Sequence, residues 1–134
     1  MRTKVVLVVA AVALLVAAGS AVAHHSFSAE FDRTKKFSMT GTVTKVEWMN
    51  PHTFFYIDVT DEKTKKVTNW AMEMGSPNGL MRQGWSRSTM KIGDKVTVDG
   101  SLAKDGSPTG NATTVILVAT GQKLFAASSQ GVTP

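Results

Sequence analysis

From residue 37 onward, apolar and polar residues alternate in short stretches, which is the pattern of strands with one buried face. The clearest stretch is 53–60, in which Phe55 lies on one face and Tyr56 on the other. The strands predicted in this way are 37–48, 53–60, 66–74, 95–100 and 111–118, with residues 121–125 as a candidate edge element.

A short helix is predicted between the third and fourth of these strands. Ser76 is a good N-cap, Pro77 suits the first helical turn, and Gly84 can end the helix in a left-handed conformation. Three strands, a short helix and two further strands is the element order of an OB barrel, the fold of many oligonucleotide- and oligosaccharide-binding domains. We therefore expect a mainly β chain that forms a small five-stranded OB-like barrel with one short helix between strands 3 and 4. A small β-sandwich is the alternative.

The chain has 134 residues, which suits one domain, and we expect the barrel over residues 37–125. Residues 24–36 are polar and mixed in character, and they are expected to form an arm that packs Phe27 and Phe31 onto the barrel. Residues 126–134 are expected to form a loose tail.

Residues 1–23 have the three parts of a cleavable secretion signal. Arg2 and Lys4 precede an uncharged apolar run, and Ala21 and Ala23 stand at the two positions that a signal peptidase inspects. The run is too short for a permanent transmembrane helix, which needs about 20 apolar residues. We therefore expect cleavage after Ala23, export to the periplasm and no membrane span in the mature protein. A short retained anchor is the alternative.

Composition and motifs exclude several classes of function. The chain has no cysteine, which rules out a disulfide framework, a thiolate metal site and a catalytic thiol. It has 15 basic and 10 acidic residues, and signal cleavage would remove two of the basic ones, so no nucleic-acid partner is indicated. No nucleophile elbow, phosphate-binding glycine loop or paired carboxylate spacing is present. An enzyme is therefore not indicated, apart from redox chemistry at a metal.

The three histidines occur in only two places, with His24 and His25 at the predicted mature N-terminus and His52 after Asn50-Pro51. An N-terminal histidine offers its free α-amine and its imidazole Nδ1 to one metal. A second imidazole completes a set of three nitrogens that suits copper. The sequence therefore predicts a copper site formed by His24 and His52. An alternative copper site uses His25, through the α-amine, a backbone amide and the imidazole.

A thioether ligand, zinc and a structural role for the histidines are the other possibilities. Met49 is an additional candidate ligand, since thioether sulfur suits Cu(I) and Met49 lies three residues before His52. Zinc more often requires a fourth protein ligand, and no spacing points to one. Met72 and Met74 alternate with a tryptophan on one strand face, so we expect them in the core. The alternative for the histidines is structural, in a loose arm and as the cap of a strand end.

A second hypothesis makes the protein a non-enzymatic OB-type module. In this interpretation the loop after the first strand and an aromatic face bind an envelope protein or a small ligand, as the corresponding face of OB barrels binds oligonucleotides or sugars. The residues expected to form that surface are Trp48, Asn50, Tyr56 and Trp85. The sequence gives no indication of an oligomeric state.

The chain also resembles a known family through a combination of short motifs. These are His24-His25-Ser26-Phe27, Gly41-Thr42-Val43, Trp48-Met49-Asn50-Pro51-His52, Gly75-Ser76-Pro77, Gly84-Trp85 and Gly93-Asp94. Together they are similar to a family of small exported Gram-negative bacterial proteins that is catalogued only as a domain of unknown function. The resemblance covers nearly the whole mature chain. It implies a periplasmic setting and brings no established activity.

Overall fold

The structure is a computed structural model, and it describes residues 1, 4 and 27–127. The predicted cleavage site, His24 and His25 lie outside the described residues, as does the end of the chain from residue 128. Among the described residues, no helix is long and apolar enough to cross a membrane.

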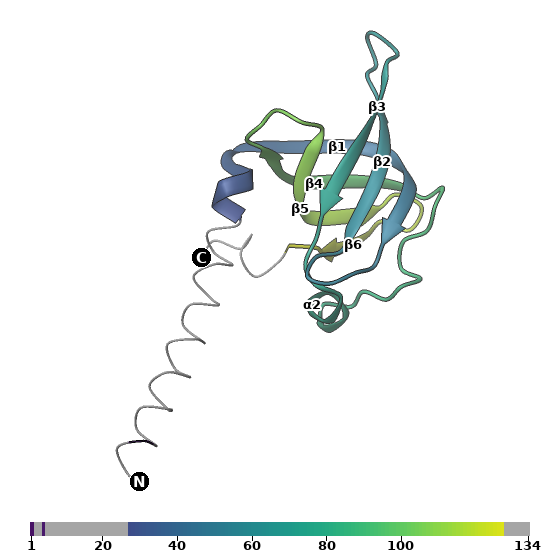
Figure 1. The fold of residues 1–134 in the computed structure, drawn as a ribbon. Coiled ribbons are helices and arrows are strands. Elements are labelled where there is room, and N and C mark those ends of the chain that lie inside the picture. Colours follow the sequence, from purple (N-terminus) through teal and green to yellow (C-terminus); the bar gives the residue numbers. More distant parts are fainter. Residues whose placement is uncertain (2–3, 5–26, 128–134) are drawn as a thin grey trace.

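The described chain folds into a barrel of six strands (Figure 1). The elements in chain order are β1 (Phe31–Glu47), β2 (Phe54–Thr60), β3 (Val67–Glu73), α2 (Pro77–Arg82), β4 (Lys95–Ala103), β5 (Thr109–Leu117) and β6 (Gln122–Phe125). Neighbouring strands run in the order β3-β2-β1-β4-β5-β6, and a parallel pairing of β3 with β5 closes the ring. The predicted OB-like barrel is confirmed, with β6 as a short additional strand at the edge.

β1 is the longest strand, because one half of it pairs with β4 and the other half with β2. The two halves meet at Thr42, which is in register with both Asp58 and Lys95. Gly41 lies at this bend, and a Cβ there would stand 2.6 Å from the carbonyl oxygen of Asp58. A glycine is therefore required where the strand changes partners.

β1 begins at Phe31, six residues before the predicted start at residue 37. Residues 33–36 are exposed, so they show no apolar alternation, yet Phe31 and Lys36 both pair with β4. The part of the predicted arm from residue 31 to residue 36 thus belongs to the barrel.

α2 begins and ends as its sequence predicts. Ser76 is the N-cap, and its Oγ accepts a hydrogen bond of 3.2 Å from the backbone N–H of Gly79. Pro77 stands at the first helical position. Gly84 follows the helix with a φ of +95°, in the left-handed region that favours glycine.

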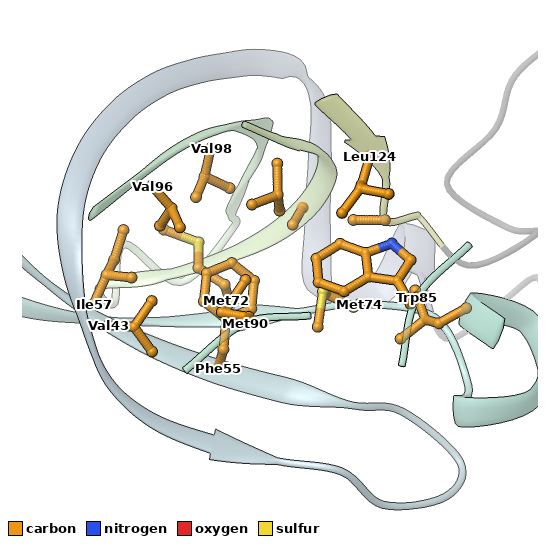
Figure 2. Close-up of a cluster of buried hydrophobic side chains, with 14 residues drawn as sticks. Val43, Phe55, Ile57, Met72, Met74, Trp85, Met90, Val96, Val98 and Leu124 are labelled. Atoms are coloured by element: carbon orange, nitrogen blue, oxygen red, sulfur yellow. The ribbon is translucent and has the colours of Figure 1, made fainter. Parts of the chain in front are cut away.

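The core fills the barrel and extends under α2 (Figure 2). Met72 and Met74 are buried in it, which confirms their prediction as core residues. Its other large members are Val43, Phe55, Ile57, Leu80, Trp85, Met90, Val96, Val98, Val115 and Leu124. Ala126 and Ala127 are buried as well, so the predicted loose tail does not begin before residue 128.

Candidate metal centre

His52 lies in the loop that joins β1 to β2, residues 48–53, beside the start of α2 (Figure 1). The peptide bond between Asn50 and Pro51 is cis. Two backbone hydrogen bonds fix the end of this loop, from Thr53 N to the oxygen of Gly75 at 3.0 Å and from Met74 N to the oxygen of Thr53 at 2.8 Å. The residue after His52 is thereby held against the end of β3, which places the imidazole there as well.

One nitrogen of the His52 ring makes a hydrogen bond, and the other makes none to the described residues. Nδ1 lies 3.2 Å from the backbone oxygen of Met74. Because a carbonyl oxygen can only accept a hydrogen bond, Nδ1 is the nitrogen that carries the proton. Nε2 makes no hydrogen bond to any residue that the structure describes. The side chain is 24% exposed, so a ligand can reach it.

A buried carboxylate stands beside the same ring. Oε1 of Glu73 lies 3.6 Å from Nδ1 of His52, and the Glu73 side chain is only 11% exposed. Burial raises the pKa of Glu73, and the like charge of Glu30 raises it further, whereas His52 and a hydrogen bond from Asn111 act in the opposite direction. That hydrogen bond runs from Asn111 Nδ2 to Glu73 Oε1 over 3.4 Å.

Glu73 and Asn111 are partners in the parallel pairing that closes the barrel. Asn111 is fully buried, so its amide has few alternatives to the carboxylate of Glu73. The two residues therefore form a fixed polar pair next to His52.

The segment that leads to the predicted mature N-terminus is anchored to the barrel. Residues 27–30 form a helical turn, and both Phe27 and Phe31 are buried with ring centroids 5.5 Å apart. The packing predicted for these two aromatic residues is confirmed. The backbone oxygen of Glu30 accepts a hydrogen bond of 2.8 Å from Lys104 N. This turn is therefore held against the segment that follows β4.

Of the predicted metal ligands, the structure places His52 and Met49. Met49 belongs to the same loop and is 45% exposed. His24 and His25 lie outside the described residues. Within 27–127 no group of three or more histidine, cysteine, aspartate or glutamate side chains is arranged to hold a metal ion. A metal at His52 therefore needs donors from elsewhere.

The residues expected to form a binding surface differ in burial. Trp85 is buried at 3% exposure, and its Nε1 donates a hydrogen bond of 2.8 Å to the backbone oxygen of Phe125. Trp48 is partly buried against the core, and Asn50 is exposed in the loop. Tyr56 lies on the outer face of β2 with Glu47. The burial of Trp85 removes it from the expected surface.

Sequence reasoning missed Glu73 and Asn111 as parts of this site. The alternation of β3 puts Glu73 on the outer face, opposite Met72 and Met74, where a carboxylate is normally solvated. Its pairing with Asn111 of β5 is a long-range feature that local alternation does not reveal. The one local signal was a carboxylate between two core methionines.

Comparison with known proteins gives a family without a function. The model of a family of unknown function, DUF6152, matches residues 11–112, which include β1 to β4, α2 and the loop of His52. A search of curated proteins gives no match to the chain. Because the family model matches well over half of the sequence, the chain belongs to the DUF6152 family.

Proposed function

We propose that the protein binds copper in the periplasm, through the α-amine and Nδ1 of His24 and through Nε2 of His52. The observation that carries the proposal is the contact of 3.2 Å between Nδ1 of His52 and the backbone oxygen of Met74. The Nδ1–H of His52 is bonded to a backbone carbonyl, which leaves Nε2 with a lone pair for a metal. In metalloproteins, the second ring nitrogen of a histidine ligand almost always donates its N–H in a hydrogen bond of this kind.

The anchoring of Phe27 limits how far His24 can lie from the barrel. Three residues of chain separate His24 from Phe27, and they span at most about 11 Å. Phe27 is buried in the turn whose Glu30 acts on Glu73, and Glu73 is 3.6 Å from the His52 ring. The proposal requires that this short span brings an amino terminus at residue 24 to the His52 ring.

Ligand chemistry favours copper for this site. Three nitrogens without a thiolate or a carboxylate suit Cu(II) or Cu(I), and imidazole binds the late first-row metals most strongly. Met49 would add a thioether for Cu(I) from the same loop. Zinc would ask for a fourth protein ligand. The periplasmic setting rests on the secretion signal predicted over residues 1–23.

The test begins with the protein as it is exported. Mass spectrometry of the periplasmic form should find His24 as the first residue, and Cu(II) titration should then show one tight site. His52→Ala is expected to lower the Cu(II) affinity at least about tenfold, because one of three nitrogens is lost. Extending the N-terminus by three small residues should do the same while it keeps every imidazole.

His25→Ala is the matched control, since it removes a neighbouring imidazole that this site does not use. Its Cu(II) affinity should equal that of the parent. If His25→Ala abolishes binding and His52→Ala does not, copper is held by the alternative site at His25. A mature chain that begins at another residue would overturn the proposal outright.

A further inference from the structure

We propose that Glu73 is a positioning residue for the copper site, which fixes the ring of His52 and makes the site favour Cu(II) over Cu(I). This inference rests on the proposed function, because it concerns how the same histidine holds its metal. The residues that carry it surround Nδ1 of His52, the nitrogen that does not bind the metal.

Two acceptors lie near Nδ1 of His52. The backbone oxygen of Met74 is 3.2 Å from Nδ1, and Oε1 of Glu73 is 3.6 Å from the same atom. Neither a carbonyl nor a carboxylate can donate, so together they keep the proton on Nδ1. The tautomer that presents Nε2 to a metal is thereby selected before any metal arrives.

Glu73 is held in place by its own contacts. Asn111 donates to Oε1 from the neighbouring strand of the closed barrel, at 3.4 Å. The side chain is 11% exposed, so its position is set by packing more than by solvent. A carboxylate fixed in this way can fix the imidazole beside it.

The ion-pair partner of Glu73 is His52, which carries no charge when it binds a metal through Nε2. The nearby Glu30 adds a second negative charge. A cation bound at Nε2 of His52 would compensate this buried charge, and the attraction would be screened little by water.

This electrostatic term depends on the charge of the ion. Cu(II) carries one more positive charge than Cu(I), so a fixed negative charge stabilises Cu(II) by about twice as much. Glu73 therefore selects between the two oxidation states, whereas the nitrogen ligands alone accept both. The thioether of Met49 would act in the opposite sense.

The test is Glu73→Gln, which removes the charge and preserves the shape. Glu62→Gln is the matched control, because Glu62 is an exposed carboxylate in the β2–β3 turn, at the far end of β2 (Figure 1). We expect Glu73→Gln to lower the Cu(II) affinity about 10–100-fold. The Cu(I) affinity, measured against a Cu(I) chelator, should fall by only about the square root of that factor. Glu62→Gln should change neither.

The outcomes separate this inference from the proposed function. If His52→Ala binds Cu(II) as tightly as the parent, the proposed function fails. The role of Glu73 alone is overturned in two cases, both with His52→Ala having lost Cu(II) binding. In the first, Glu73→Gln keeps the Cu(II) affinity of the parent. In the second, Glu73→Gln lowers the affinities for Cu(II) and Cu(I) by the same factor. In a His52→Ala background, Glu73→Gln should have no further effect.

A measurement on the parent protein tests the inference without any variant. Nitrogen-15 NMR of the metal-free protein, at a pH high enough to keep the ring neutral, distinguishes the two tautomers of His52. The Nδ1–H form is expected. A ring protonated on Nε2 would overturn the positioning role of Glu73.

Discussion

The hydroxyl of Tyr56 donates a hydrogen bond of 3.0 Å to Oε2 of Glu47, which joins the outer faces of β2 and β1. Lys45 completes the group, since its Nζ forms an ion pair with Glu47 and lies 5.3 Å from the centre of the Tyr56 ring. The hydrogen bond to Glu47 raises the pKa of Tyr56 above 10.0, as do burial and the charge of that carboxylate.

Tyr56 is the one tyrosine of the chain, so its titration can be followed without interference from another phenol. Glu47→Gln should lower the pKa of Tyr56, because the charged acceptor that stabilises the neutral phenol is removed. The phenolate absorbance, recorded against pH, measures this shift. Glu62→Gln should leave the titration curve unchanged, and an unchanged curve for Glu47→Gln would contradict the contact.

A second prediction concerns stability without metal. Burial raises the pKa of Glu73 above 4.5, so the unfolded chain releases this proton before the folded chain does. The ionised carboxylate therefore destabilises the fold as the pH rises above 4.5, and the penalty disappears in acid.

Glu73→Gln should accordingly raise the melting temperature of the metal-free protein near pH 7, by an amount that shrinks toward about pH 4. Thermal denaturation followed by circular dichroism at the two pH values measures this. A variant that is less stable than the parent near pH 7 would show that the charge of Glu73 contributes to folding.

Gly41 gives a third prediction, at the bend of β1. In Gly41→Ala the new Cβ would stand 2.6 Å from the carbonyl oxygen of Asp58 and 3.0 Å from Val59 Cγ2. The obstacle is backbone, which cannot rotate away, so we expect a loss of about 1–3 kcal/mol in the free energy of unfolding. Ser38→Ala, at an exposed position of the same strand, should change it by less than about 0.5 kcal/mol. Urea denaturation compares the two, and equal midpoints would refute the close approach.

Trp85 gives the fourth prediction, as a core residue. Trp85→Phe removes the donor to the oxygen of Phe125 and some buried surface, so unfolding should become easier by about 1–3 kcal/mol. Ile92→Ala, at a side chain that is 71% exposed, should have little effect. Denaturation monitored by tryptophan fluorescence measures both. If Trp85→Phe unfolds as the parent does, the indole is not part of the stabilising core.

The sequence was sufficient for the elements because their signals are local. Alternation located the strands, and the cap at Ser76 with the glycine at Gly84 located α2. Alternation placed the start of β1 too late, because the side chains of residues 33–36 are exposed although Phe31 and Lys36 pair with β4. Exposed polar residues carry no alternating pattern, so only the register with β4 reveals this part of the strand.

The candidate site could be predicted only in part, since it combines local and long-range features. His52 stands out by its residue type and its position after a proline. The carboxylate beside it does not, because the partner of Glu73 in β5, Asn111, is 38 residues away. The position of Trp85 has the same explanation, since its partner Phe125 is 40 residues away.

The pairing of β3 with β5 joins Glu73 to Asn111, which are 38 residues apart in the chain. Bringing together residues so far apart in the chain costs loop-closure entropy, so the pairing of β3 with β5 is expected to form late in folding. A half-folded chain consequently lacks the environment around residue 52, however complete its hairpins are. Any molecule that binds there discriminates against the open chain and shifts the folding equilibrium by mass action toward the closed ring.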